Sequence, residues 1–126
     1  MLSASHRLHS DELSAHENRE TYGKCNNPYG HGHNYVIEVL AGGPIDPETG
    51  MVIDMAALDA VVRTQVLERF DHMNLNLDPL FADRVSTTEN LCMAIYDVLR
   101  AALQPAVLDK VRIEETENNF FEYSGA

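Results

Sequence analysis

The sequence is short of cysteine, and it has no long apolar run. Its two cysteines, Cys25 and Cys92, form no disulfide framework. No stretch approaches the roughly 20 apolar residues that a membrane-spanning helix needs. The first residues also lack the apolar core of a signal peptide. We therefore expect a cytoplasmic protein with reduced thiols and no contact with a membrane.

Basic side chains are also scarce. Nine lysines and arginines stand against 20 acidic residues, which gives a formal net charge of −11. Nucleic-acid binding needs a concentrated basic surface, so we expect no nucleic-acid partner. The chain has 126 residues, of which 44% are hydrophobic. That is enough for one domain, residues 1–126, which buries roughly two-thirds of its unfolded surface.

The histidines are the most informative residues that are present. His31 and His33 are separated by one residue, so on a β-strand both side chains point to the same face. Two imidazoles on one face can converge on one ion, and a third would complete the ligand set of some catalytic zinc enzymes. We expect His6 to be the third ligand because it lies in a predicted strand, whereas His9 and His16 do not. The plain alternative is that these are surface or core histidines without a metal.

Cys25 precedes His31 by six residues and leaves three roles open. It can close a structural zinc site as a fourth ligand, act as a nucleophile or base beside the metal, or be an inert buried thiol. A base role requires a lowered pKa, which Lys24, zinc or a protonated histidine can supply. The polar surroundings of Cys25 argue against burial. Cys92, in an apolar helical segment, fits the inert role.

Two places in the sequence carry acidic residues that are candidates for the site. Asp71 precedes His72, and an aspartate that orients a histidine is a common way to tune a proton shuttle, although the dipeptide alone is weak evidence. Strand periodicity places Glu115 on the apolar face and Glu114 on the opposite, solvated face. A carboxylate on an apolar face is costly without a partner, so Glu115 is either a functional acid or paired with an internal arginine.

The apolar pattern predicts an α+β fold in which two helices cover an antiparallel sheet. Asp54 is a suitable N-cap for the first helix, and Ser86 with Glu89 forms a capping box for the second. Thr87 and Thr88 would place hydroxyls and N–H groups at the start of that helix, where polar ligand atoms can bind. The expected strands cover residues 2–8, 34–40, 51–53, 110–115 and 119–123, with irregular segments at 9–30 and 69–85. We expect a hairpin between 34–40 and 51–53 and a closing hairpin between 110–115 and 119–123. Each strand pair is then joined locally, so the sheet is antiparallel and needs no parallel crossover.

Six motifs in this order resemble those of the 6-pyruvoyl-tetrahydropterin synthase family. They are SASHRL at 3–8, GKCNNPYGHGHNY at 23–35, DPETGMV at 46–52, DHMNL at 71–75, STTEN at 86–90 and EETENN at 114–119. Five residues separate Cys25 from His31. The related 6-carboxy-tetrahydropterin synthases of the queuosine pathway usually have a shorter spacing. The resemblance therefore favours the biopterin-type branch.

The resemblance implies a zinc-dependent lyase that converts 7,8-dihydroneopterin triphosphate to 6-pyruvoyl-tetrahydropterin and triphosphate. Magnesium is expected as the companion of the triphosphate. The implied roles are zinc binding by His6, His31 and His33; proton abstraction by Cys25 with Asp71 and His72 as relay; and pterin binding by Glu115, Thr87 and Thr88. Arg7 and Lys24 are candidates for the triphosphate, because local basic groups must offset the acidic surface.

The family fold is the tunnelling fold, a four-stranded antiparallel sheet with two helices on one face. In the family, trimers close their strands into a barrel and two trimers stack into a hexamer, with active sites between subunits. We therefore expect a homo-oligomer of this kind. Two alternatives remain: the sister activity that yields 6-carboxy-tetrahydropterin, and a non-catalytic zinc- or pterin-binding module with Cys25 as the fourth ligand.

Overall fold

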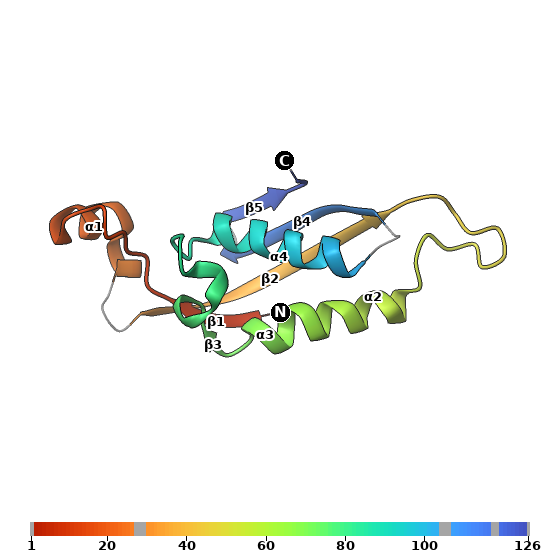
Figure 1. The fold of residues 1–126 in the computed structure, drawn as a ribbon, viewed down its shortest axis with the longest axis horizontal. Helices are drawn as coiled ribbons and strands as arrows, with labels where there is room; N and C mark the ends of the chain where they lie inside the picture. Colours follow the sequence, from red (N-terminus) through yellow and green to blue (C-terminus); the bar gives the residue numbers. More distant parts are fainter. Residues whose placement is uncertain (1, 27–29, 104–106, 117–118, 126) are drawn as a thin grey trace.

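One five-stranded sheet organises the part of the chain that the computed structural model describes, residues 2–26, 30–103, 107–116 and 119–125. At Cys25, His31, Val107 and Thr116 the description covers the backbone alone. The strands lie in the order β3-β1-β2-β4-β5 (Figure 1). Their bounds are β1 Leu2–His6, β2 His31–Gly42, β3 Met73–Asn74, β4 Val107–Thr116 and β5 Asn119–Tyr123.

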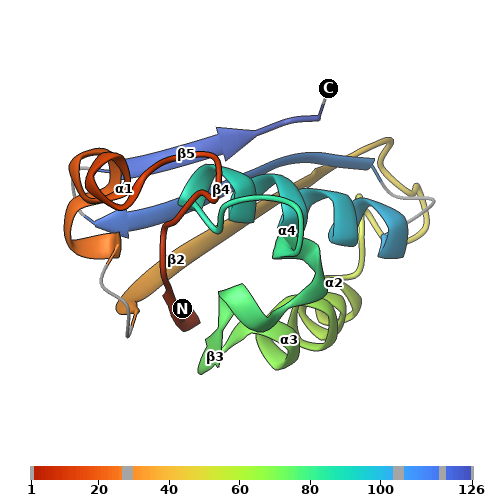
Figure 2. The same cartoon turned by 60° about the vertical axis from the view of Figure 1, so that its left-hand side comes forward.

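Helices α2 and α4 pack on one face of this sheet, and α1 lies at one end of it (Figures 1 and 2). None of the helices in the described ranges is long and apolar enough to cross a membrane. The helices are α1 Ala15–Tyr22, α2 Met55–Val62, α3 Glu68–Phe70 and α4 Thr88–Ala102, with a π-helical turn η2 at Arg63–Leu67 and 3-10 turns η1 Gly23–Asn26, η3 Leu75–Leu77 and η4 Pro79–Phe81.

The core lies between the sheet and these helices. Strand β1 alternates regularly, with Leu2, Ala4 and His6 buried and the residues between them half-buried. Burial of one large apolar side chain contributes about 1.5–3 kcal/mol, so this face fixes the register of β1. His6 is thereby directed to the interior. The largest fully buried apolar side chains are Leu2, Tyr35, Phe70, Leu75, Leu91, Ile95, Leu99 and Ile113.

The expectation of an irregular segment over residues 9–30 is wrong, because α1 and η1 lie within it. The helix begins with a capping box. The Ser14 hydroxyl accepts a hydrogen bond from Glu17 N at 3.1 Å, and the Glu17 carboxylate accepts one from Ser14 N at 3.1 Å. This Ser-x-x-Glu signal was available in the sequence. Because the segment is mostly polar and has no apolar stripe, its composition did not indicate a helix.

The strand expected at residues 51–53 is also wrong. This segment is irregular, and Met51 and Val52 are exposed. β2 instead pairs with β4, far along the chain, with Ile37 opposite Ile113. The strand pairs are therefore not all joined locally. The closing hairpin of β4 and β5 is confirmed, with Ile113 opposite Phe121.

Strand β3 contradicts the expectation of a sheet without parallel pairs. Its two residues pair with β1 in parallel, Ala4 opposite Met73 and Ser5 opposite Asn74. A strand of two residues has no periodicity from which it could be predicted. It lies directly after Asp71 and His72, which are bonded to Ser3 of β1.

The caps of the two long helices are partly as expected. Asp54 caps α2, because its carboxylate accepts a hydrogen bond from Ala56 N at 2.9 Å. The cap of α4 is Thr87 and not Ser86: the Thr87 hydroxyl accepts a hydrogen bond from Asn90 N at 3.1 Å. Ser86 lies just outside the helix, which leaves its carbonyl for another partner.

Cys92 is an inert core thiol, as expected. It lies buried in α4, and its Sγ donates to Val111 O at 3.3 Å. Burial, with a smaller contribution from the charge of Glu122, raises the pKa of Cys92 to about 11. The thiol is therefore protonated at neutral pH and unsuited to proton abstraction.

Candidate active site

His6 is the most deeply buried of the predicted site residues whose side chains the structure describes. It ends β1 with 1% of its surface exposed, and its Nδ1 lies 2.7 Å from Ser86 O, just before α4. A carbonyl oxygen only accepts hydrogen bonds, so Nδ1 is the donor and carries the proton. In the neutral ring Nε2 is then the nitrogen with the lone pair. This is the arrangement in which proteins orient a metal-binding histidine.

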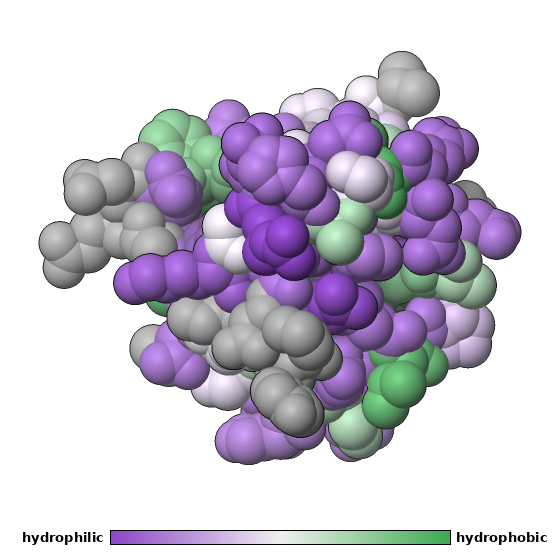
Figure 3. Space-filling model, turned by 90° about the vertical axis from the view of Figure 1, so that its left-hand side faces the viewer, coloured by the Kyte–Doolittle hydropathy of each residue, from purple (hydrophilic) through white to green (hydrophobic). Residues whose placement is uncertain are grey.

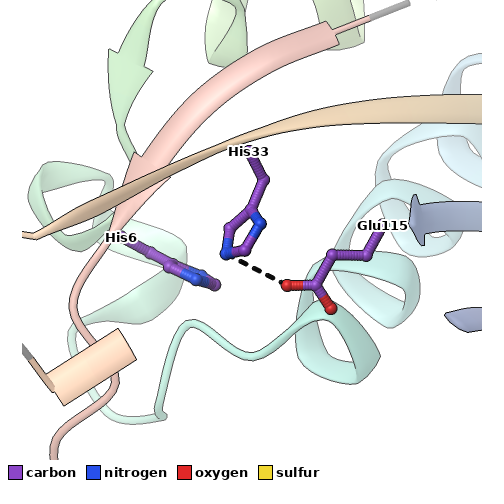
Figure 4. Close-up of side chains that lie close together, drawn as sticks. All are labelled: His6, His33 and Glu115. Atoms are coloured by element: carbon purple, nitrogen blue, oxygen red, sulfur yellow. Dashed lines mark ion pairs between the residues drawn. The ribbon is translucent and has the colours of Figure 1, made fainter. Parts of the chain in front are cut away.

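His33 and Glu115 meet beside His6. The Nε2 of His33 lies 3.1 Å from Oε1 of Glu115, and the two side chains are 13% and 16% exposed. The rings of His6 and His33 are edge to face, with centroids 4.8 Å apart. Figure 4 shows the three side chains converging from β1, β2 and β4. Three strands thus supply one compact, partly buried group.

This cluster can hold a metal ion. Among the described residues, one ligand atom each from His6, His33 and Glu115 lies within 4.8 Å of the others. Imidazole nitrogens and carboxylate oxygens are zinc ligands. The donor set and the Nδ1 contact of His6 therefore fit the metal that the sequence predicts, but they do not distinguish zinc from other divalent ions.

The side chains of Cys25 and His31 lie outside the described residues. Of these two residues, only His31 has a backbone position that bears on the predicted metal site. It opens β2 and pairs with His6 across the β1–β2 ladder, two residues before His33. Ala4 is the ladder partner of His33. The backbone therefore brings the positions of all three predicted histidine ligands to the same end of two neighbouring strands.

Asp71 and His72 form a second group at the β1–β3 edge of the sheet. Asp71 Oδ1 accepts a hydrogen bond from Ser3 N at 2.8 Å, and His72 Nδ1 lies 3.2 Å from Asp71 Oδ2. The Ser3 hydrogen bond, with the neighbouring His72, lowers the pKa of Asp71 below its ordinary 3.8. Asp71 is therefore ionised at neutral pH and can orient the His72 ring.

His72 projects outward from this edge. Its backbone has a φ of 60°, in the left-handed region, and its N donates to Ser3 O. Histidine tolerates this region better than most residues, and such conformations cluster at functional sites. The ring is 81% exposed. The metal-ligand cluster found within the described residues does not include Asp71 or His72.

A groove of about 530 Å³ lies along the β1–β2 ladder and reaches one member of each group. Both His33 and His72 line it, together with Ser3, Ala4, Ser5, Gly32, Asn34, Met73 and Asn74. The end of the molecule that carries α1 is mostly hydrophilic where its surface is coloured (Figure 3).

The remaining predicted substrate residues are Thr87, Thr88, Arg7 and Lys24. Thr87 and Thr88 directly follow Ser86, the partner of His6; Thr87 caps α4 and Thr88 is buried. Arg7 follows His6, and its Nε donates to Asn26 O at 3.2 Å. Lys24 is exposed in η1. Part of the Arg7 guanidinium is thus engaged within the chain.

Glu114 and Glu115 divide as the strand pattern predicts. Glu114 accepts a hydrogen bond from Arg112 at 2.9 Å and its side chain is 36% exposed. Glu115 contacts His33 on the covered face. The expected alternative, a pair between Glu115 and an internal arginine, is thus not what the structure shows: Glu115 contacts His33, and Arg112 bonds Glu114. The sequence did not predict that Glu115 meets a histidine of the metal set.

Ser86 is a residue of the site that the sequence analysis missed. Its carbonyl orients His6 across 80 positions of the chain. A backbone acceptor leaves no residue-type signal, and the Ser86 side chain resembled a helix cap. No pattern in the sequence could have identified this contact.

Comparison with known proteins then decides the family. A family model described as 6-pyruvoyl tetrahydropterin synthase matches residues 1–126. The chain belongs to this family. A 6-pyruvoyl tetrahydrobiopterin synthase of Poecilia reticulata is 52% identical over 125 residues, covering 98% of this chain and 85% of the relative. The human protein of the same name is 51% identical, with 98% and 86% covered.

Solved structures of the family agree with the fold. The 6-pyruvoyl tetrahydropterin synthase of Caenorhabditis elegans superposes with a TM-score of 0.93 at 49% identity, covering 99% of this chain and 90% of that one. A Plasmodium vivax protein of the same name has a TM-score of 0.69 at 17% identity, covering 97% and 89%. At that identity the second likeness concerns the fold alone. The α+β tunnelling fold is thus confirmed, with the short β3 added to the four strands that the family resemblance implies.

Proposed function

We propose that this chain is a 6-pyruvoyl-tetrahydropterin synthase, a carbon–oxygen lyase that acts on 7,8-dihydroneopterin triphosphate. The domain of residues 1–126 carries the activity. The observation that supports it most is the cluster of His6, His33 and Glu115 in a chain whose relatives with this name are about 50% identical. His31, the ladder partner of His6, is proposed as the third imidazole ligand.

The metal proposed at the three histidines is zinc, which would act as a Lewis acid toward the side-chain hydroxyls of the substrate. The site residues then have separate proposed roles. Ser86 O keeps the proton on His6 Nδ1, so that Nε2 faces the site as a ligand. Cys25 removes the substrate proton, and His72, oriented by ionised Asp71, manages a second proton. Magnesium would accompany the departing triphosphate.

Glu115 is proposed to bind the pterin ring through its 2-amino and N3 edge. Its position on the covered face supports this role, because a largely desolvated carboxylate binds two N–H donors strongly. Thr87 and Thr88 offer polar groups at the start of α4, and Arg7 and Lys24 are the proposed contacts of the triphosphate. Contact with His33 also makes Glu115 a candidate metal ligand, so the two roles require a test.

The substitution Glu115→Gln separates these roles. If Glu115 binds the pterin, we expect KM to rise or kcat/KM to fall by about tenfold or more, since a charged hydrogen bond contributes roughly 1.5–3 kcal/mol. Zinc content should remain that of the unsubstituted protein. Glu114→Gln, a matched change on the solvated face, should leave both quantities unchanged. Loss of zinc from Glu115→Gln would contradict the pterin role and identify Glu115 as a ligand.

A homo-oligomer, a hexamer of two trimers, is proposed because one sheet face carries exposed apolar side chains. Val36 is 39%, Leu40 42% and Phe120 52% exposed. Val36 pairs with Glu114, and Glu114 pairs with Phe120, so Val36 and Phe120 lie on the same face of the sheet. Strand alternation places Leu40 on this face too, and it is the face turned away from the helices. β5 is an outer strand of the sheet, and outer strands are sites of pairing between chains.

Removal and return of zinc tests the proposed chemistry. Protein stripped by a chelator should release no triphosphate from 7,8-dihydroneopterin triphosphate, and addition of Zn²⁺ should restore release. Magnesium alone should not restore it, because its proposed site is the substrate. Turnover by thoroughly stripped protein at the rate of the zinc-loaded form would contradict zinc dependence.

A further inference from the structure

The carboxamide of Asn76 holds the backbone directly after His6. Its Oδ1 accepts a hydrogen bond from Arg7 N at 2.6 Å, and its Nδ2 donates to Arg7 O at 2.9 Å. Both backbone groups of one residue are thus bonded by one side chain, in the way that a neighbouring strand would bond them. β1 ends at His6, so Asn76 extends the ordered backbone by one residue beyond the strand.

The same side chain reaches the residue that orients the His6 ring. Ser86 Oγ donates to Asn76 Oδ1 at 3.2 Å, while Ser86 O accepts from His6 Nδ1 at 2.7 Å. Asn76 is therefore bonded to two parts of the His6 surroundings: the backbone next to it and the serine whose carbonyl fixes its ring. These parts are separated by about 80 positions in the sequence and are joined through one amide.

Asn76 is itself well anchored. Its backbone N donates to Asn74 Oδ1 at 3.0 Å, and the preceding Leu75 is fully buried. The carbonyl of Leu75 accepts a hydrogen bond from Asp78 N at 3.0 Å, which closes the η3 turn. The carboxamide is therefore presented from a fixed turn, which a positioning role requires.

We infer that Asn76 is a positioning residue for the metal site: it holds His6 and Ser86 in the geometry that directs His6 Nε2 to the ion. This inference rests on the proposed zinc site. Partners behind metal ligands typically contribute tenfold to a hundredfold in metal affinity. Asn76 is exposed, so water can bond to Arg7 and Ser86 when the amide is removed. Its loss should loosen the site without unfolding the protein.

Asn18 provides a matched control in the same chain. Its Oδ1 accepts from Ser10 N at 2.8 Å, and its Nδ2 donates to Ser10 O at 3.0 Å, which repeats the bonding of Asn76 to Arg7. Asn18 is fully buried in α1 and supports the 10–14 segment. Asn18→Ala should therefore destabilise the protein at least as much as Asn76→Ala, with no effect on His6.

The test is zinc affinity, measured with Zn²⁺ alone by competition with a chromophoric chelator. Asn76→Ala should bind zinc about tenfold to a hundredfold more weakly than the unsubstituted protein. Asn76→Asp keeps the acceptor for Arg7 N and Ser86 Oγ but loses the donor to Arg7 O. The zinc affinity of Asn76→Asp should lie between that of Asn76→Ala and that of the unsubstituted protein. If Asn76→Ala does not fold, Asn76→Asp is the variant that tests the inference. Asn18→Ala should retain the original affinity.

The inference is overturned if Asn76→Ala or, failing that, Asn76→Asp binds zinc as tightly as the unsubstituted protein. It is also overturned if Asn18→Ala weakens binding equally, because the effect would then follow general stability. His6→Ala separates this failure from failure of the proposed function. If zinc affinity does not depend on His6, the metal site itself is wrong and the inference falls with it. If it depends on His6 but not on Asn76, the inference alone fails.

Discussion

Replacement of Cys25 by alanine is expected to lower kcat by roughly 10²–10⁴-fold, the usual contribution of a general base. The reason is that the proposed reaction begins with removal of a proton from carbon, and Cys25 is the residue assigned to it. Zinc content should not change, because the three proposed ligands are histidines. The measurement is triphosphate release together with metal content of the same preparation.

Cys92→Ala is the control for this prediction. Cys92 is buried in α4 with its pKa raised to about 11, so its replacement removes a thiol without removing a base. Turnover of this variant should equal that of the unsubstituted protein at a temperature where both are folded. If Cys25→Ala loses zinc along with activity, Cys25 is a fourth ligand and the site is structural, which is the non-catalytic alternative.

Replacement of His33 by alanine is expected to abolish both zinc binding and turnover. His33 lies at the centre of the cluster, between the His6 ring and the Glu115 carboxylate. Zinc at a hundredfold excess over its Kd should add about 2.7 kcal/mol to the free energy of unfolding of the unsubstituted protein. The variant should show little of this gain. Thermal unfolding with and without Zn²⁺ measures it.

His16→Ala is the matched control. His16 was a competing candidate for the third ligand, but it lies exposed on α1, where its Nε2 is 3.0 Å from Glu20. This variant should keep the full stabilisation by zinc. Equal stabilisation of the His33 and His16 variants would show that the cluster is not the zinc site.

The sequence predicted those parts of the fold that depend on periodic or local signals. Asp54 caps a helix, and β4 and β5 form the closing hairpin. It failed where the deciding contacts are distant. β3 exists because Met73 pairs with Ala4, far away in the sequence. The contact of the Ser86 carbonyl with His6, just before the Thr87 cap of α4, likewise joins distant parts of the chain. The missed α1 is different, since its Ser14–Glu17 capping box is a local signal.

In the candidate site, too, local patterns were predictable from the sequence and contacts between distant residues were not. The spacing of His31 and His33 predicted one common face for a strand that contains them, and β2 does contain both, although the strand was expected only from residue 34. Strand alternation placed Glu115 on the covered face. The meeting of Glu115 with His33 depends on how β2 and β4 are paired, which composition and spacing do not encode. Asn76 could not be found at all from sequence, because an asparagine after a buried leucine resembles any turn residue.

The most direct test of the central claim is the identity of the product. The zinc-loaded protein is incubated with 7,8-dihydroneopterin triphosphate under anaerobic conditions, and the products are identified by mass spectrometry. The account predicts 6-pyruvoyl-tetrahydropterin and triphosphate as the main products. Formation of 6-carboxy-tetrahydropterin with acetaldehyde as the main products, or no conversion by the zinc-loaded protein, would contradict it.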